Sequence, residues 1–191
     1  MHTAVNICQD LSDQEIIRKS VDDLAYFACL YQRYEARLLR YIHRLIWLAG
    51  DEAEDVLQDA FLLIFKNLHA YNPAMKASSW IYRIVHNQAI SWARKRNAYG
   101  RNQVTSLQES TEPANPEPDG EPVQEEHIHL VLSALSPEHR EVLILKFLEE
   151  MSYAEISDVL KIPEGTVATR INRAKKAFQL QARLLHITFT L

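Results

Sequence analysis

Apolar residues recur at steps of three and four along much of the chain, which predicts helices rather than strands. The first ten residues lack this pattern and are expected to form a loose tail. From Ser12 the sequence becomes helical, with an apolar stripe that runs from Leu24 to Leu48. We expect Gly50 to follow the end of that helix and Asp51 to cap the next one.

The next helix is predicted from Glu52 to about His69. Two apolar rows belong to it: Val56, Ala60 and Leu63, and beside them Leu57, Phe61, Ile64 and Leu68. A loop centred on Asn72-Pro73 follows, and then a third helix from Ser79 or Trp80 to about Arg96. On that helix we expect a set of polar and aromatic residues to face outward: Tyr82, Arg83, His86, Asn87, Arg94, Lys95 and Arg96.

Periodicity disappears between about residues 99 and 126, where prolines and acids dominate. Such a composition cannot bury enough apolar surface to order itself, so a linker is predicted. Helices resume near Glu126. Ser136-Pro137 starts a helix that reaches about Glu150 and is expected to bury Val142, Leu145 and Phe147.

Two short helices joined by a tight turn are predicted from Ser152 to Phe178. Ser152 and Glu155 form a capping box, and Lys161 to Pro163 interrupts the pattern. The second helix carries an apolar stripe of Val167, Ile171, Ala174 and Phe178. Its opposite face is cationic and amide-bearing: Thr169, Arg170, Asn172, Arg173, Lys175 and Lys176. Such a face suits the major groove of DNA, and the alternative is a solvated basic helix in a bundle.

The composition agrees with an all-α chain. Hydrophobic residues are 47% of 191, enough for a core, and only four glycines and seven prolines occur. The fold class predicted is two small helical domains, at 12–98 and 127–185, joined by a flexible acidic linker containing prolines. Cys8 and Cys29 suggest neither a disulfide framework nor a zinc cluster, which favours a reducing cytoplasm. No signal peptide or membrane span is recognised.

The net charge of −4 is unevenly distributed along the chain. Residues 71–101 hold six bases and no acid, residues 102–126 hold seven acids and no base, and residues 161–191 hold six bases and one acid. Two cationic segments separated by acids suggest two contacts with polyanions. In 71–101, aromatic and amide groups lie between the cations, as in surfaces that hold single-stranded bases. A plain amphipathic helix is the alternative there.

Catalytic and metal-binding patterns are weak. Glu126-His-Ile-His129 gives a single E-x-x-H, and the second copy that a di-iron bundle needs is missing. We therefore predict no metal, no cofactor and no enzymatic activity.

Taken together, these motifs resemble the extracytoplasmic function (ECF) sigma factors, which give bacterial RNA polymerase its promoter specificity. Asp55-Val-Leu-Gln58-Asp59-Ala-Phe61 resembles the family's polymerase-docking helix, and Trp80-Ile-Tyr-Arg-Ile-Val-His-Asn87 resembles its −10 helix. Leu135-Ser-Pro-Glu-His-Arg140, Tyr153-Ala-Glu-Ile156 and Pro163-Glu-Gly-Thr-Val167 through Arg173 resemble its −35 reader. A similarity to sigma factors of heavy-metal-resistance operons is attached to no particular residue.

The resemblance implies three groups of site residues. Those for core polymerase are Asp55, Gln58, Asp59 and Phe61. Those for the −10 element are Asn72, Lys76, Ser79, Trp80, Arg83, Asn87, Arg94, Lys95 and Arg96, with residues 72–79 forming a pocket for a flipped base. Those for the −35 element are Thr166, Thr169, Arg170, Asn172, Arg173, Lys175 and Lys176.

The chain departs from the family pattern at Ala77, Ser157 and Lys161, where an aromatic, an alanine and a glycine are usual. The partners implied are core RNA polymerase, promoter DNA as −35 duplex and melted −10 strand, and a soluble or membrane-associated anti-sigma factor. Two other functions stay open on the sequence. One is an autonomous helix-turn-helix regulator, which binds duplex by itself, and the other is a helical adaptor with no DNA role.

Overall fold

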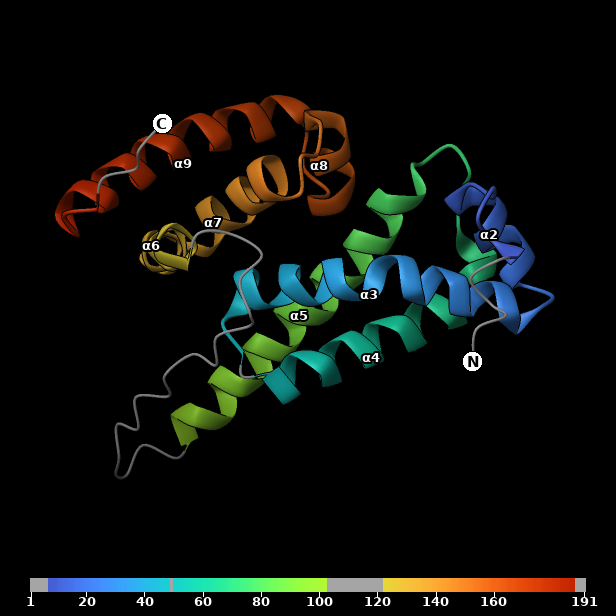
Figure 1. Cartoon of the computed structure of the whole chain (residues 1–191). Helices are drawn as coiled ribbons and strands as arrows, with labels where there is room; N and C mark the ends of the chain where they lie inside the picture. The colour runs from blue at the N-terminus through green and yellow to red at the C-terminus, as the bar shows by residue number, and fades with distance from the viewer. Residues whose placement is uncertain (1–6, 49, 103–121, 188–191) are drawn as a thin grey trace. The chain divides into compact units, whose positions relative to one another are not determined.

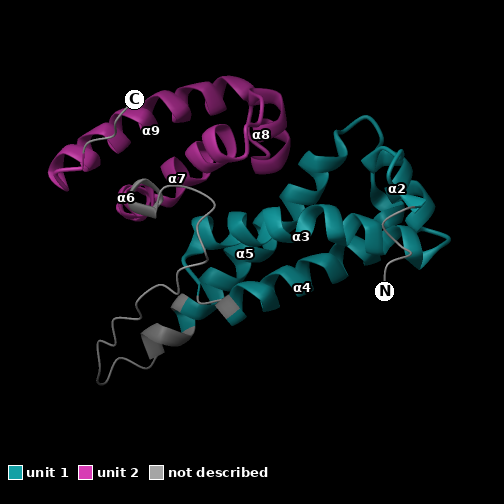
Figure 2. Cartoon of the chain, viewed as in Figure 1, with its two compact units in different colours: residues 1–113 teal, residues 114–191 magenta. Residues whose placement is uncertain are grey.

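The computed structural model describes residues 7–48, 50–102 and 122–187, and in these ranges all regular structure is helical (Figure 1). Contacts divide the chain into two units, residues 1–113 and 114–191 (Figure 2). The all-α prediction is therefore confirmed. None of the described helices combines the length and the apolar character needed to cross a bilayer.

Unit 1 is built on α3 (Leu24–Ile46), which packs against α2 (Asp13–Ser20), α4 (Gly50–Lys66) and α5 (Ala77–Asn102). The short turn η1 (Leu68–Ala70) follows α4. A capping box between Ser12 and Glu15 starts α2, and the Asp23 side chain caps α3. The predicted stripe on α3 is buried at Leu30, Tyr34, Leu38, Tyr41 and Leu45, whereas Tyr31 is half-buried and Leu24 is 65% exposed.

Several helix ends differ from the predictions. Trp47, not Gly50, ends α3 in a left-handed conformation, and Gly50 is the first residue of α4. Helix α5 begins at Ala77 and continues to Asn102, and α6 (Pro122–Ser133) begins before Glu126. Helical residues thus occupy both ends of the predicted linker, and its centre, 103–121, lies outside the described residues. The predicted domain limits stay a prediction.

The expected loose tail is wrong for its described part. Cys8 is buried and forms a disulfide with Cys29 on α3, across 21 residues of sequence. The prediction of no disulfide is wrong, because the turn between α2 and α3 brings the Cα atoms of the two cysteines to 6.3 Å. Nothing in the local sequence around either cysteine indicates this approach.

Unit 2 consists of α6, α7 (Pro137–Leu143), the π-helical turn η2 (Ile144–Leu148), α8 (Tyr153–Leu160) and α9 (Glu164–Leu184). Ser136 is the N-cap of α7 with Pro137 at the first helical position, as predicted. Val142 and Leu145 are buried, but Phe147 is 53% exposed, because η2 winds more widely than an α-helix and shifts the faces that follow.

Candidate nucleic-acid interface

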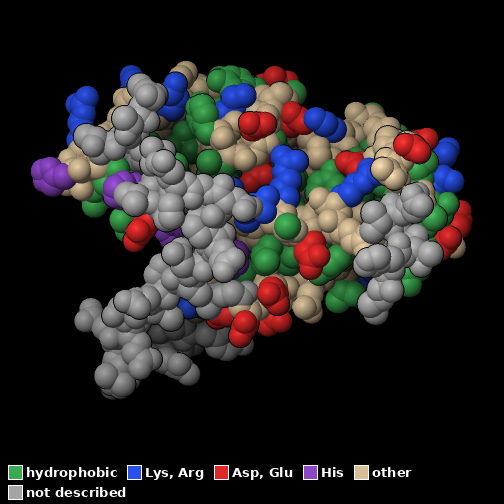
Figure 3. Space-filling view, in the orientation of Figure 1, with side chains coloured by type: hydrophobic (Ala, Val, Ile, Leu, Met, Phe, Trp, Pro, Cys, Tyr) green, Lys and Arg blue, Asp and Glu red, His purple; other side chains and the backbone are tan. Residues whose placement is uncertain are grey.

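Helix α4 presents an acidic face to solvent. Asp55, Gln58 and Asp59 are exposed on it, and Asp59 accepts a hydrogen bond from Gln88 of α5 at 3.2 Å. Acidic side chains gather over the first half of α4 in the space-filling view (Figure 3). The three residues lie together, as the sequence predicted, and their positions leave them accessible to a partner.

Phe61 lies in the core and not on that face. It is 3% exposed, and its ring packs against Phe27 and Tyr31 of α3, with centroids 6.2 and 4.6 Å away. Phe61 therefore positions α4 on α3, and its side chain is not available for a partner in this fold.

Apolar side chains that the sequence analysis did not assign to a site lie on the same helix. Leu62 and Phe65 are 56% and 43% exposed, and Leu63, expected in a buried row, is 37% exposed. Leu62 and Phe65 belong to neither predicted apolar row, and this is the signal that could have identified them. A partner that covers this part of α4 would bury apolar surface next to the acidic face.

The loop before α5 is internally hydrogen-bonded. The Asn72 side chain accepts a bond from the Ala74 amide at 3.0 Å, and the Tyr71 hydroxyl donates to the Met75 carbonyl at 2.7 Å. Asn72 and Lys76 are exposed. The tyrosine ring lies against Trp80, with centroids 5.2 Å apart, so the loop is supported by the core beneath it.

Ser79, in the predicted flipped-base pocket, and Trp80, beside it, are buried. Ser79 is 0% exposed, and its hydroxyl has no hydrogen-bond partner in the structure. Trp80 is 3% exposed. Both point inward because α5 begins at Ala77, two or three residues earlier than predicted, and its first turn packs against the core. They support the loop from below instead of lining a pocket.

On α5 the predicted cations are accessible, but two residues expected outside are in the core. Arg94, Lys95, Arg96 and Asn87 are exposed and Arg83 is half-buried. Tyr82 and His86 are buried against Tyr41, whose hydroxyl lies 2.8 Å from Nδ1 of His86. Burial lowers the pKa of His86 to about 4, so its imidazole is neutral at pH 7.

Arg96 already has partners within unit 1. It forms an ion pair with Glu52 of α4 at 2.9 Å and lies over the Trp92 ring at 5.3 Å. About half of its side chain stays exposed, so a phosphate could still reach it. Arg94 and Lys95 are exposed beside it at this end of the helix.

The helix-turn-helix forms as predicted. Ser152 and Glu155 make both hydrogen bonds of the capping box at the start of α8. Lys161 ends the helix in a left-handed conformation with φ of 56°, at the position where the family pattern has glycine. Ser157 donates to the Ile162 carbonyl at 2.6 Å, a bond across the turn that the usual alanine cannot make.

Helix α9 has the two faces that the sequence predicted. Val167, Ile171 and Ala174 are buried, and Phe178 is half-buried. The accessible polar residues of the opposite face are Thr169, Asn172, Arg173, Lys175 and Lys176. Thr166 is half-buried, and Thr169 donates to the Gly165 carbonyl at 2.9 Å. Lys175 lies 6.0 Å from the ring centroid of Phe147.

Arg170 differs from the rest of that face. Its side chain is 26% exposed and pairs with Glu141 of α7 at 3.2 Å and with Glu138 at 3.8 Å. Burial raises the pKa of Glu141 to about 7, although the charge of Arg170 lowers it. The structure therefore places Arg170 between α7 and α9, and leaves Arg173 facing solvent.

Known protein families match both units. Residues 30–99 match the model of Sigma-70 region 2, and residues 126–178 match that of Sigma-70 region 4. The chain thus has two regions of a sigma factor, in the order expected.

Comparison with individual proteins identifies the class of sigma factor to which the chain belongs. The ECF RNA polymerase sigma factor SigW of Bacillus subtilis is 31% identical over 167 residues, which cover 82% of this chain and 89% of SigW. SigL of Mycobacterium tuberculosis is 32% identical over 87% of this chain and 94% of its own. The chain belongs to the family of ECF sigma factors. It is a transcription initiation factor that acts with RNA polymerase at promoters, and not an enzyme.

Solved structures agree with this fold. The structure of CnrH in complex with the cytosolic domain of CnrY has a TM-score of 0.69 at 21% identity, covering 90% of this chain and 97% of the matched chain. RpoE of Bartonella quintana, in complex with the anti-sigma factor NepR, has a TM-score of 0.69 at 22% identity, covering 82% and 96%.

Proposed function

We propose that unit 1 docks on core RNA polymerase through the acidic face of α4 and holds the melted −10 strand along α5, while α9 of unit 2 reads the −35 duplex. The observation that carries this proposal is the exposed polar face of α9, with Asn172 and Arg173 opposite the buried Val167 and Ile171. Amide and guanidinium groups are the side chains that read adenine and guanine in the major groove.

The −10 contact is proposed with a smaller set of residues than the sequence suggested. Asn72 and Lys76 in the loop are exposed, and Arg83 and Asn87 on α5 are at least partly accessible. Arg94 and Lys95 then supply phosphate contacts further along the helix. A flipped base would be held above the loop, since Ser79 and Trp80 are buried beneath it.

Footprinting of a promoter with and without core polymerase tests the assignment of the −10 element to unit 1 and the −35 element to unit 2. We expect protection of both elements only with polymerase present, because neither unit alone supplies enough contacts for tight binding. Arg173→Ala should remove protection at −35 and leave −10 protection intact. Gln179→Ala, an exposed polar position further along the same helix, is the matched control and should protect both elements. Loss of protection by Arg173→Ala at both elements, or at neither, would contradict the assignment.

The proposal extends to an inhibitory partner. RpoE, a structural neighbour, was solved with an anti-sigma factor, and we infer a partner of that kind for this chain. Unit 2 has a groove of about 280 Å³ that would suit an apolar helix, lined by Ile128, Leu132, Leu143, Phe147, Leu148, Lys175, Phe178 and Gln179. Phe147→Ala should weaken capture of such a partner and leave transcription with core polymerase unchanged. Undiminished capture by this variant would exclude the groove as the binding site.

Two finer assignments also stay proposals. We infer a cytoplasmic location, because the polymerase on which the family acts is found there. A role in heavy-metal resistance is tested by comparing the transcripts of cells with and without this factor after metal challenge. If the transcripts induced by metal were the same with and without the factor, a role in heavy-metal resistance would be excluded.

A further inference from the structure

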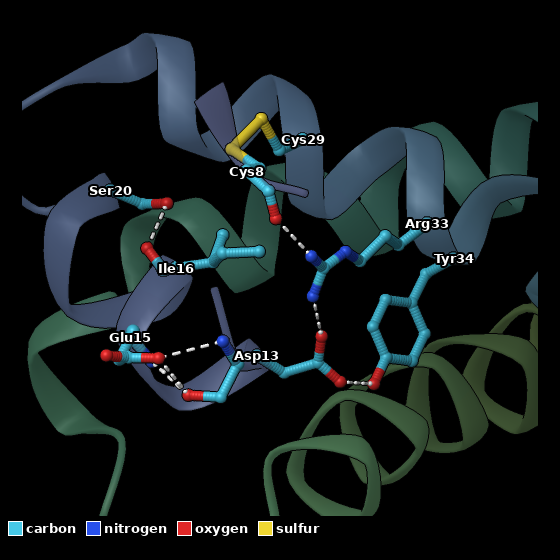
Figure 4. A network of polar contacts seen from close by, with 9 residues as sticks. Cys8, Asp13, Glu15, Ile16, Ser20, Cys29, Arg33 and Tyr34 are labelled. Carbon is cyan, nitrogen blue, oxygen red and sulfur yellow. Dashed lines mark hydrogen bonds and ion pairs between the residues drawn. A yellow bond between two sulfur atoms is a disulfide. The ribbon is translucent and has the colours of Figure 1, made fainter. Parts of the chain in front are cut away.

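Within unit 1, a disulfide joins the segment before α2 to α3. Cys8 precedes α2, Cys29 lies in the second turn of α3, and each is 3% exposed in the disulfide (Figure 4). Both cysteines of the chain are used in it. Disulfides are rare in the reducing cytoplasm, and those that occur there are usually transient or redox-sensing.

Next to the disulfide, a network of hydrogen bonds connects α2 with α3. Arg33 donates to the Cys8 carbonyl and, at 2.8 Å, to the carboxylate of Asp13, the first residue of α2 (Figure 4). The other oxygen of Asp13 accepts from the Tyr34 hydroxyl at 2.6 Å. Without the disulfide, residues 7–12 and α2 would be held to α3 by non-covalent contacts, among them the hydrogen bonds of Arg33 and Tyr34.

Helix α2 in turn touches the loop before α5. The Gln14 side chain donates to the Pro73 carbonyl at 3.3 Å. A groove of about 510 Å³ lies between the two segments, with Ile17 on one wall and Leu68 and Tyr71 on the other. The position of α2 thus bears on the loop that carries Asn72 and Lys76.

We propose that Cys8 and Cys29 form a reversible redox site that controls how firmly α2 supports this loop. The effect on promoters rests on the function proposed above, whereas the thiol chemistry does not. In the oxidised protein the loop is held for the −10 strand, and in the reduced protein it is looser and opening of the promoter is weaker.

A peroxide is the oxidant class that balances the step. One thiolate attacks a peroxide oxygen, the O–O bond breaks, and a sulfenic acid and water form after protonation. The second thiolate attacks the sulfenic sulfur, the S–O bond breaks, and a second water leaves. Two thiols lose two electrons and hydrogen peroxide becomes two waters. A dithiol reductant reverses the change by thiol–disulfide exchange.

The chemistry is tested on the full chain without polymerase. Reduced protein is treated with hydrogen peroxide, then with dithiothreitol, and thiols are alkylated and counted by mass spectrometry at each stage. We expect both thiols to disappear together and to return under native conditions. A bond that fails to form, or that dithiothreitol cannot reduce without denaturant, would overturn the proposal.

The proposed effect of the disulfide on promoter opening is tested by transcription with core polymerase. The oxidised protein should give about fivefold more transcript from a duplex promoter than the reduced one. A variant with Cys8→Ser and Cys29→Ser should behave as the reduced protein and ignore peroxide. Gln14→Ala should keep the thiol chemistry but lose the difference in transcript. Equal transcription by both forms of the parent would refute the coupling, whereas no transcription by either would count against the proposed function.

Discussion

Lys161 adopts a backbone conformation that is less favourable for lysine than for the glycine usual in the family. It holds the turn of the helix-turn-helix in a left-handed conformation, which disfavours side chains with a Cβ atom. We expect Lys161→Gly to raise the free energy of unfolding of unit 2 by about 0.5–1 kcal/mol, measured by urea denaturation. The same change at Lys176, inside α9, should instead lower it by about 1 kcal/mol. Equal effects at both positions would show that the turn is not strained.

Arg170 and Arg173 of α9 should give different effects when each is replaced. Arg173→Ala should weaken −35 binding by about 1–3 kcal/mol with normal stability, because its side chain faces solvent. Arg170→Ala should lower stability by about 1–2 kcal/mol, because it removes the cation that faces the largely buried Glu141 carboxylate. Adding Glu141→Gln to Arg170→Ala should restore most of that stability. Melting curves and DNA titrations of the same preparations distinguish the two roles. A normal melting curve for Arg170→Ala would contradict its role in holding α9 against α7.

At the scale of elements, the acidic face of α4 provides the next prediction. Asp55, Gln58 and Asp59 are exposed, and the buried side of the helix is complete without them. Gln58→Ala with Asp59→Ala should change stability by less than about 0.5 kcal/mol and abolish co-purification with core polymerase. Phe61→Ala is the contrasting variant, and it should unfold unit 1 because it removes a core ring. Normal co-purification of the double variant would contradict the docking assignment.

The sequence predicted the helices well because their periodicity and caps are local signals. Ser152 with Glu155, and the stripe from Val167 to Ala174, needed no tertiary information. What failed depended on neighbours from elsewhere in the chain. Arg170 turns toward Glu141 of α7, and Cys8 meets Cys29 only after α2 and α3 pack. A pattern can assign the faces of one helix, but not the groups that another helix brings to them.

At the scale of the molecule, the two units should respond oppositely to pH. The pKa of His86 is lowered from 6.5 to about 4, so unit 1 should lose stability as the pH falls through that range. The pKa of Glu141 is raised from 4.5 to about 7, so unit 2 should lose stability as the pH rises from 4.5 to 7. Each effect is at most on the order of 3 kcal/mol.

Urea denaturation at several pH values checks this prediction. All three tryptophans, Trp47, Trp80 and Trp92, are in unit 1, so their fluorescence reports that unit while circular dichroism reports both. Glu141→Gln should flatten the response of unit 2, and Glu164→Gln, at an exposed position of α9, should not. Parallel pH responses of the two units would contradict the assigned ionisation states.

Transcription in vitro with purified core polymerase on a promoter library tests the central claim most directly. The account predicts transcripts whose start sites share −35 and −10 elements, lost with the double variant at Gln58 and Asp59 and reduced with Arg173→Ala. No transcription above that of core alone, together with tight binding of the isolated chain to duplex DNA, would contradict it and identify an autonomous regulator instead.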